Sequence, residues 1–337
     1  MRLLLAAAAT LTTALVAACS SAAPPPAQTA AVPLPSVQLG VDVDFYATPG
    51  ANITAAARQD IAYIKSLHAN AVSISFPFFT DKTGSVLRPL AKTPSVAQLD
   101  TLITVAEQAG LAVTVRPLLS QTALGKARVR WKPAQLAAWF SAYQRFLLPY
   151  AAAAQRDHAD VFVIGTELNH FATAPEWSAL STAVAAVFHG KLAFSNNWSG
   201  TKNATAGVTQ MTDAYESVPL ADSASQTALA GAVSYWSHAL PYGSVLSEVG
   251  IAAQSGAYAH PWALGSKSAP IKPEIQANWF SAQCQAVVQD HLGGIYFWPL
   301  YFGQSLTART EGPTSWAATA GAAAIARCFS AMAASSQ

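Results

Sequence analysis

The sequence predicts an α/β protein built as a single (β/α)8 TIM barrel, preceded by a signal peptide and a disordered tether. Short apolar runs alternate with segments of helical spacing over residues 37–330. Such alternation is typical of parallel strands joined by crossover helices, and eight strand–helix units in about 290 residues match the barrel. Hydrophobic residues make up 52% of the chain and charged residues 11%, which favours a large buried core. A doubly wound open sheet is the alternative, but no glycine-rich phosphate loop follows the first expected strand.

The N-terminus has the pattern of an export signal over residues 1–18. Arg2 precedes an apolar run, 3–18, that is shorter than the roughly 20 residues needed to span a bilayer as a helix. The run ends in Val-Ala-Ala-Cys, which resembles a bacterial lipobox and predicts lipidation of Cys19. Residues 19–36, rich in Pro, Ala and Ser, are expected to be a flexible tether. We therefore expect an exported protein, lipid-anchored at the bacterial cell membrane and facing outward; an ordinary signal peptide is the alternative.

Eight apolar runs are the expected strands. Each is short, and most are bounded by Gly, Pro, Asn or Asp, as buried strands of a parallel sheet usually are. The fifth and sixth have the weakest pattern. In order, the runs are 37–45, 70–76, 111–117, 160–165, 191–195, 207–212, 243–250 and 293–299.

Seven helices are expected between and after these strands. The first, 53–69, carries an apolar stripe at steps of three and four, from Ile53 to Leu67. The second repeats that stripe and stops at Gly110, and the third is expected to begin with Pro133 in its first turn. In order, the helical segments are 53–69, 95–110, 133–157, 175–189, 222–240, 273–292 and 313–330, followed by a disordered tail, 331–337.

Two cysteines remain after Cys19, namely Cys284 and Cys328. Outside the cytoplasm two cysteines in one domain are usually bridged, and each lies on one of the last two expected helices. We therefore expect a disulfide between them. Neither has a second Cys or His at ligand spacing, so we expect no metal site, and nothing indicates another cofactor.

The formal net charge is +2, from 19 basic and 17 acidic residues. Nucleic-acid binding needs a concentrated positive face, which this composition does not indicate. The near-neutral balance suits an uncharged partner such as a carbohydrate. Contact with a membrane is expected only through the lipid on Cys19, and a monomer is the default state.

Polar and aromatic residues follow the expected strands at their C-terminal ends. In TIM barrels this end carries the working residues, whereas the opposite end serves stability. In strand order they are Asp42, Asp44 and Phe45; Phe76 and Phe78; Arg116; Glu167 and Asn169; Asn197 and Trp198; Asp213 and Tyr215; Glu248; and Trp298.

Two isolated glutamates stand out in this set, Glu167 after the fourth strand and Glu248 in the seventh. Cleavage of a glycosidic bond needs one protonated carboxyl to supply the leaving oxygen with a proton and one ionised carboxylate to attack or to activate water. We expect the two strands to lie across the barrel from each other, so that the glutamates flank one bond. For Glu167 the alternative is a cap at the positive end of a helix.

The other residues fit a sugar-binding cleft. Trp198 and Trp298 are expected to form its floor, because sugar C–H faces pack on flat side chains. Three loop tryptophans, Trp131, Trp236 and Trp262, are expected to extend it. We expect Arg116 to be a charge partner inside the site, and the pair Asp42 and Asp44 either to hold sugar hydroxyls or to satisfy backbone groups at the rim.

The order and spacing of these motifs resemble glycoside hydrolase family 113, a clan A family whose known members are mostly β-mannanases. The likeness covers about residues 40 to 325. The matching motifs are GTEL followed by Glu176-Trp177, KLAFSNNW (191–198), TDAY (212–215), SEVG around Glu248, IQANWF (275–280) and GGIYFWP (293–299).

The resemblance implies a retaining mechanism on a mannan-type β-linked substrate. Glu248 is then the nucleophile, Glu167 the acid/base and Tyr215 the group that orients the nucleophile. It also implies that Arg116, Asn197, Trp198 and Trp298 line the subsite at the bond that is cut, with Asp44 as a further sugar contact.

The chain departs from the family pattern at three places. Thr166 stands where most clan A enzymes have Asn, Arg116 where Lys is usual, and Glu216-Ser217 where an aromatic–proline pair is usual. Two other functions remain open: a sugar-binding lipoprotein of a transport system, which would have two lobes, and a transglycosylase on the same barrel.

Overall fold

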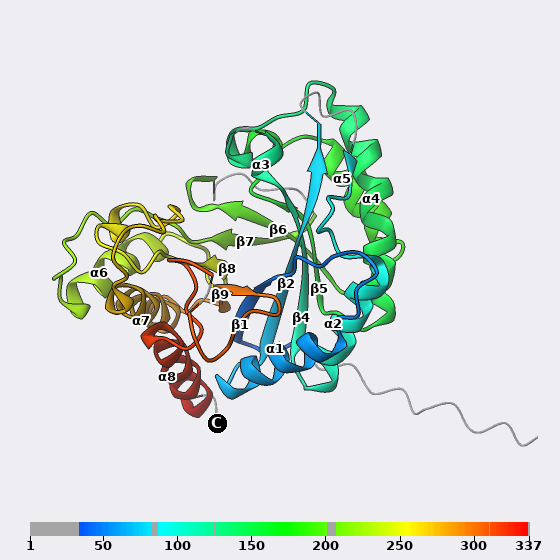
Figure 1. Ribbon diagram of the computed structural model, residues 1–337. Helices are drawn as coiled ribbons and strands as arrows, with labels where there is room; N and C mark the ends of the chain where they lie inside the picture. The colour runs from blue at the N-terminus through cyan, green and yellow to red at the C-terminus, as the bar shows by residue number, and fades with distance from the viewer. Residues whose placement is uncertain (1–33, 82–86, 125, 201–206, 310, 336–337) are drawn as a thin grey trace, which may run out of the picture. The chain divides into compact units, whose positions relative to one another are not determined.

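The computed structural model of the protein describes residues 34–81, 87–124, 126–200, 207–309 and 311–335. Within them eight parallel strands form a closed ring in the order β1-β2-β4-β5-β6-β7-β8-β9, with β9 paired back to β1 (Figure 1). The predicted barrel and its eight strand runs are therefore confirmed. The strands are β1 (Gln38–Asp44), β2 (Ala71–Thr80), β4 (Ala112–Leu119), β5 (Val161–Thr166), β6 (Lys191–Asn197), β7 (Thr209–Asp213), β8 (Val245–Val249) and β9 (Gly294–Tyr301).

A short strand outside the ring, β3 (Leu87–Arg88), pairs antiparallel with the end of β2. Helices follow most of the ring strands. They are α1 (Thr54–Ser66), α2 (Val96–Gln108), α3 (Gln121–Leu124), α4 (Leu136–Arg156), α5 (Glu176–Ala185), α6 (Gln226–Ser237), α7 (Pro273–Gln289) and α8 (Ala320–Ser335). In the described residues, none of these helices is both long and apolar enough to cross a membrane. The expected signal peptide and Cys19 lie outside the described residues.

Two helices begin later than the sequence predicts. α4 starts at Leu136 instead of Pro133, because residues 133–135 take a non-helical backbone and Gln135 is the N-cap. α8 starts at Ala320 instead of residue 313, because Gln276 holds the preceding segment by donating its Nε2 to the carbonyl of Thr314 at 2.9 Å. α8 also continues to Ser335, so the predicted disordered tail is wrong over 331–335, where the alanine-rich sequence favours a helix.

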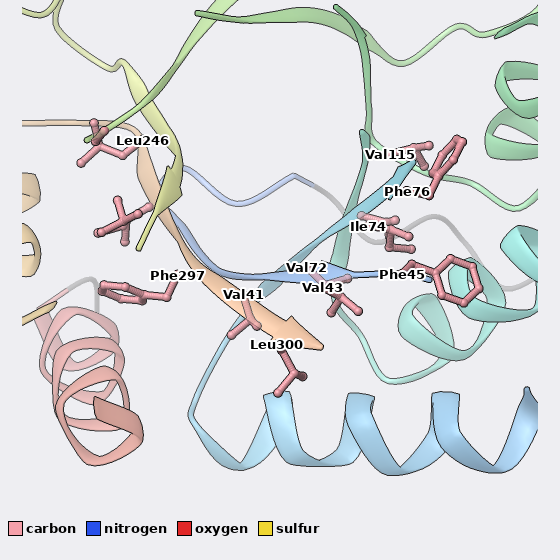
Figure 2. Close-up of a cluster of buried hydrophobic side chains, with 14 of the residues drawn as sticks. Val41, Val43, Phe45, Val72, Ile74, Phe76, Val115, Leu246, Phe297 and Leu300 are labelled. Carbon is pink, nitrogen blue, oxygen red and sulfur yellow. The ribbon is translucent and has the colours of Figure 1, made fainter. Parts of the chain in front are cut away.

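The outer core lies between the ring and its helices. Successive side chains on a strand point to opposite faces, so the alternate residues Val41 and Val43 of β1 face the helices. Figure 2 shows these valines together with Ile74, Phe76 and Phe297 from neighbouring strands, and all five are buried. The same alternation turns Asp42 and Asp44 towards the interior of the barrel.

The interior of the barrel changes from apolar to ionic along its axis. Near the N-terminal ends of the strands it holds a second apolar cluster that includes Val163, Met211 and Tyr296. Gly40 makes room for the Tyr296 ring, since a Cβ at Gly40 would lie 2.2 Å from a ring carbon. Further along the strands, inward positions carry Asp42, Arg116, Ser195 and Asp213, which hydrogen-bond one another at the base of the site.

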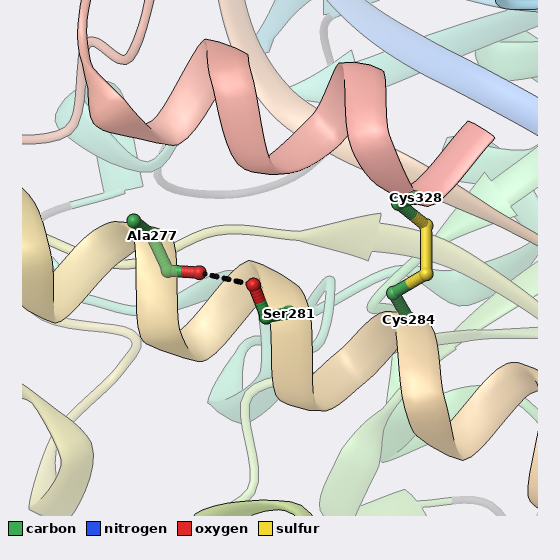
Figure 3. Close-up of a disulfide and its surroundings, with 4 residues drawn as sticks. All are labelled: Ala277, Ser281, Cys284 and Cys328. Carbon is green, nitrogen blue, oxygen red and sulfur yellow. Dashed lines mark hydrogen bonds between the residues drawn. A yellow bond between two sulfur atoms is a disulfide. The ribbon is translucent and has the colours of Figure 1, made fainter. Parts of the chain in front are cut away.

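A disulfide joins Cys284 on α7 to Cys328 on α8, with the two Cα atoms 5.9 Å apart (Figure 3). The sequence predicted this pair. The bond connects the helices on either side of β9, the strand that closes the ring, and it spans 44 residues.

Replacing both cysteines by alanine is expected to lower the free energy of unfolding by about 4 kcal/mol, because the unfolded chain regains the freedom of a loop of this length. Urea titration of the oxidised protein and of C284A/C328A measures the difference. The matched control is the wild type in reductant, which should unfold near the midpoint of the variant. Equal midpoints for the oxidised wild type and the variant would contradict the expectation.

Candidate active site

A cavity of about 640 Å³ opens at the C-terminal ends of the strands and contains both predicted glutamates. Acidic, basic and aromatic side chains line it together. Its lining comprises Asp44, Tyr46, Lys92, Leu118, Ser120, Gln121, Thr122, Arg128, Glu167, Trp198, Tyr215, Glu248, Trp262, Leu264, Trp298, Tyr301, Phe302, Gly303, Gln304 and Glu311.

Glu248, on β8, has both carboxylate oxygens hydrogen-bonded. The hydroxyl of Tyr215 donates to Oε1 at 2.5 Å, and Arg116 donates to Oε2. Gly250 follows at close quarters, since a Cβ there would lie 3.0 Å from the Tyr215 hydroxyl. Burial acts to raise the pKa of Glu248, but the charges of Arg116 and Arg128 and the Tyr215 hydrogen bond outweigh it and lower the pKa. Glu248 is therefore ionised at neutral pH.

Arg116, on β4, connects Glu248 to two further carboxyls beneath the cavity. Its Nη1 lies 2.8 Å from Asp42 Oδ2 and its Nη2 lies 2.6 Å from Asp213 Oδ2. Three serine hydroxyls support these acids: Ser75 bonds Asp42, while Ser195 and Ser247 bond Asp213. Burial raises the pKa of Asp42 to about 7 and that of Asp213 to about 8, although the charge of Arg116 acts to lower both. Arg116 is thus the predicted charge partner. It favours the ionised form of Glu248 more than the ionised forms of Asp42 and Asp213.

Glu167 follows β5 directly and has a left-handed backbone, with φ of 53°. Its amide donates to the carbonyl of Ser195 at 2.8 Å. Asn197 Nδ2 donates to Oε1 at 2.6 Å, and Arg128 Nε donates to Oε2 at 2.9 Å. A short 3-10 helix, Asn169–Phe171, follows in place of an α-helix, so the helix-cap alternative finds no support.

The strands β5 and β8 are not diametrically opposite. The ring places β6 and β7 between them on one side, so they stand closer together than the sequence-based expectation. Both glutamate side chains nevertheless line the same cavity.

Asp44 and Trp298 lie side by side on β1 and β9. The indole Nε1 of Trp298 donates to Asp44 Oδ1 at 3.2 Å. Burial, and then the charge of Glu248, raises the pKa of Asp44 to about 7. Near neutral pH this carboxyl can therefore both donate and accept hydrogen bonds towards the cavity. Asp42 is the next inward-facing residue of β1, and its two oxygens instead accept hydrogen bonds from Arg116 and Ser75.

A row of aromatic rings runs from Glu248 to the rim of the cavity. The ring centroid of Tyr215 lies 6.4 Å from that of Trp298 on one side and 6.1 Å from that of Trp198 on the other. Trp262 stacks on Trp198, with centroids 5.2 Å apart and an interplanar angle of 15°. The predictions for Trp198, Trp298 and Trp262 therefore agree with the lining of the cavity.

Two other tryptophans do not extend the cleft as predicted. Trp131 is 3% exposed and packs edge-on against Trp139 and Phe171 in the outer core. Trp236, on α6, packs against the same core. Both were expected in loops beside the cleft, but both side chains pack in the apolar layer between the strands and the helices.

Two predicted sugar contacts lie beneath the cavity lining. Arg116 is 0% exposed and Asn197 is 2% exposed, and neither lines the cavity. Each instead holds one of the two glutamates. Asn197 ends β6 as predicted, whereas Arg116 lies inside β4, three residues before its end at Leu119. Alternation and depth decide whether such a side chain meets the substrate or a neighbouring carboxylate.

Arg128 is the main residue that sequence reasoning missed. It lies on a 3-10 helix, Arg128–Arg130, in the long connection between β4 and α4. The segment from Lys126 to Lys132 carries a cation at every second position, which gives no sign of which one turns inward. The structure selects Arg128, whose Nη1 donates to the carbonyl of Leu119 at 3.2 Å while its Nε holds Glu167.

The described residues contain no group of three or more His, Cys, Asp or Glu placed to hold a metal ion. The acids Asp42, Asp213 and Glu248 do gather, but they gather around the guanidinium of Arg116, which occupies the position that a cation would take.

Comparison with solved structures gives the same fold. A β-1,4-mannanase of glycoside hydrolase family 113 is 14% identical, with a TM-score of 0.73 and coverage of 88% of this chain and 99% of that chain. The family 113 β-mannanase of Alicyclobacillus acidocaldarius, in complex with ManMIm, is 18% identical, with a TM-score of 0.72 and coverage of 90% and 100%. A Bacteroides ovatus family 5 xyloglucanase is more distant, at 12% identity and a TM-score of 0.54, with coverage of 87% and 75%.

A search of curated protein sequences finds no match. The model of Glycoside Hydrolase Family 113, however, matches residues 42–311, which include both glutamates and the cavity-facing ends of all eight ring strands. A match over most of the chain, joined to the barrel fold, assigns the family: the protein belongs to glycoside hydrolase family 113 and is a glycoside hydrolase.

Proposed function

We propose that the protein hydrolyses a β-linked mannan-type polysaccharide or oligosaccharide with retention of configuration. The observation that supports this is the contrast between two glutamates that line one cavity. Glu248 is held ionised by Arg116 and Tyr215. Glu167 contacts a neutral amide and an arginine that itself lines the cavity.

In the first step Glu248 attacks the anomeric carbon and the glycosidic C–O bond breaks, while Glu167 gives its proton to the leaving oxygen. Each carboxylate oxygen of Glu248 accepts one hydrogen bond, Oε1 from Tyr215 and Oε2 from Arg116. Each oxygen therefore keeps one lone pair free for attack. In the second step Glu167, now ionised, takes a proton from water, which attacks the glycosyl-enzyme and releases Glu248.

Glu167 must present a protonated oxygen to the leaving group, and each of its oxygens already accepts a hydrogen bond, Oε1 from Asn197 and Oε2 from Arg128. Asn197 lies beneath the cavity lining and comes from the adjacent strand, whereas Arg128 lines the cavity and comes from a connecting loop. We assign to Arg128 the contact that the leaving sugar displaces. The arginine would then hold the Glu167 side chain in place between turnovers.

Mannan is the proposed substrate class because the two family 113 structures cited above are described as β-mannanases. Asp44 and Trp298 supply a polar group and a flat apolar face beside Glu248, as a hexose ring requires. The departures at Arg116 and Glu216 do not argue against mannan directly, since neither residue lines the cavity.

The test is to incubate the purified protein with mannan, glucan, xylan and arabinan and to measure the reducing ends released. ¹H NMR then follows the anomer that is formed first from the substrate that is cut. We expect release from mannan, with the β-anomer appearing before mutarotation. An initial α-anomer would contradict retention, and release from another polymer alone would contradict mannan. Products longer than the substrate would identify the transglycosylase alternative.

A sugar-binding lipoprotein would have two lobes, whereas the described residues form a single barrel.

A further inference from the structure

A buried carboxyl that takes no part in the mechanism above lies next to Tyr215. Glu216 is 4% exposed and follows β7, and the Nε2 of Gln283 on α7 donates to its Oε1 at 2.9 Å. Gln283 is 0% exposed. The Tyr215 side chain reaches the cavity and Glu248, so this one dipeptide connects the proposed nucleophile to the outer helical layer.

The two side chains leave complementary atoms without partners. Glu216 Oε2 and Gln283 Oε1 are both buried and neither has a hydrogen-bond partner. Both atoms are acceptors if Glu216 is ionised, and two buried acceptors that cannot be satisfied are costly. A proton on Oε2 turns it into a donor. A planar carboxylic acid and a planar amide can then form two hydrogen bonds in a ring, and both unpaired atoms are satisfied.

In the described part of the chain no charged side chain acts on the pKa of Glu216; besides burial, the causes are hydrogen bonds from Gln283 and from the backbone amide of Glu216. The only ionisable side chain on α7 besides those in the disulfide is Glu274, an exposed acid in its first turn. α6 carries no Asp, Glu, Lys or Arg, and its tyrosine, Tyr235, is exposed. The short helix Ala257–Ala259 contributes the phenol of Tyr258, and Glu248 lies on the barrel side of the segment. Burial raises the pKa of Glu216 to about 8, although the amide of Gln283 acts to lower it.

The backbone on both sides of Glu216 is fixed. The amide of Ala214 donates to the carbonyl of Glu248 at 2.7 Å, and the amide of Val218 donates to the carbonyl of Tyr258 at 2.8 Å. Between these two anchors, the side chains of Glu216 and Ser217 both tie the segment to its surroundings.

We propose that Glu216 works as a neutral carboxylic acid, paired reciprocally with Gln283, and that it is a positioning residue that holds Tyr215 against Glu248. The kinetic part rests on the proposed function, because it takes Glu248 as the nucleophile. The structural part does not. Glu216 and Gln283 together form a polar pair that depends on a proton, and this pair is the latch.

The latch has a defined dependence on pH. The pKa of Glu216 is higher in the folded protein, at about 8, than its ordinary value of 4.5. Its contribution to stability is therefore complete below about pH 4.5 and is lost as pH rises through about 8. Glutamine at 216 can form the same two hydrogen bonds with Gln283 and carries no proton to lose.

The first arm of the test needs no substrate. Urea midpoints of the wild type and of E216Q are measured from pH 5 to pH 9, with E274Q as a control that removes an exposed acid of the neighbouring helix. We expect the wild type to lose stability relative to E216Q between pH 5 and pH 9, and E274Q to follow the wild type. Parallel curves for the wild type and E216Q would overturn the proton-dependent latch, whatever the enzyme turns out to cleave.

The second arm measures kcat and KM at pH 6 for E216M, E216Q and Y215F and for the double variant Y215F/E216M. We expect E216M to lower kcat at least tenfold with little change in KM, E216Q to restore most of it, and E216M to cost less than twofold once Tyr215 has lost its hydroxyl. Equal effects of E216M with and without that hydroxyl would show a merely structural role. If E216M does not fold, Q283M breaks the same pair from the other side and takes its place.

Discussion

Glu248→Ala is expected to lower kcat by about 10⁴- to 10⁶-fold, the range that loss of a nucleophile or its partner produces in other hydrolases. The physical reason is that the other two carboxyls around Arg116, Asp42 and Asp213, lie beneath the cavity and cannot take the place of Glu248. Azide, small enough to enter the vacated space, should restore cleavage of an aryl β-mannoside with a good leaving group. The product should be the α-mannosyl azide, formed by direct displacement.

Glu167→Ala should behave in the opposite way on the same substrates. Its loss should cost about 10²- to 10⁴-fold on mannan, whose leaving oxygen needs a proton, and far less on the activated aryl substrate in the first step. Azide should intercept the glycosyl-enzyme from the side that Glu167 occupied and give the β-mannosyl azide.

Glu274→Ala is the matched control for both variants, because it removes an exposed glutamate that lies on α7. It should have the activity of the wild type. Azide products of the same anomeric configuration from both active-site variants would contradict the assignment of two different roles, and full activity of either variant would remove that residue from the mechanism.

Arg116→Met is expected to destabilise the protein by about 3–5 kcal/mol, the usual cost of removing one partner from a buried ionic group. The variant would leave Asp42, Asp213 and Glu248 without their shared cation in the interior of the barrel. It should also move the acidic limb of kcat/KM to higher pH, because the charge of Arg116 helps to lower the pKa of Glu248.

The sign of the pH effect on stability distinguishes this account from simple loss of packing. The lowered pKa of Glu248 contributes stability above its ordinary value, and that contribution is lost as pH falls. The deficit of Arg116→Met should therefore be largest near neutral pH and should shrink in acid, as urea titrations at pH 7 and pH 4.5 would show. Arg145→Met removes an exposed arginine of α4 and should change neither the stability nor the pH profile.

Arg116→Lys keeps the charge but cannot bridge Asp42 and Asp213 with a planar fork, so its stability should fall between that of the wild type and that of Arg116→Met. A deficit that does not change with pH would contradict the electrostatic explanation.

The strands and their working ends could be predicted because β-sheet alternation and the C-terminal-end rule act locally. Asp44, Glu167 and Glu248 each follow or end an apolar run, so their positions relative to the barrel were visible in the sequence. The disulfide was predictable from helix placement and redox compartment together.

The depth of a side chain could not be predicted in this way. The sequence places Arg116 and Asn197 near strand ends like Tyr215, yet they lie beneath the cavity, because in the ring each is close enough to a glutamate to bind it instead of a sugar. Arg128 could not be predicted for a different reason. Contacts such as its hydrogen bond to the Leu119 carbonyl decide which cation of an irregular loop turns inward, and no periodic pattern in the sequence encodes such contacts. Trp131 is the opposite case: it lies in a loop, yet its side chain is buried in the core and does not line the cavity.

Closure of the ring has a consequence for the order in which the chain folds. β1 pairs with β2, its neighbour in sequence, but its other edge pairs with β9, and the hydroxyl of Tyr296 reaches Gln38 across 258 residues. Because synthesis proceeds from the N-terminus, the free edge of β1 must wait for nearly the whole chain, and long-range pairings of this kind form slowly. An open strand edge is also a template for association with other chains. Asp42 and Arg116 can meet early, on strands made in succession, whereas Glu248 joins them only when β8 and β9 complete the circle. The active site is thus among the last parts of the molecule to be assembled.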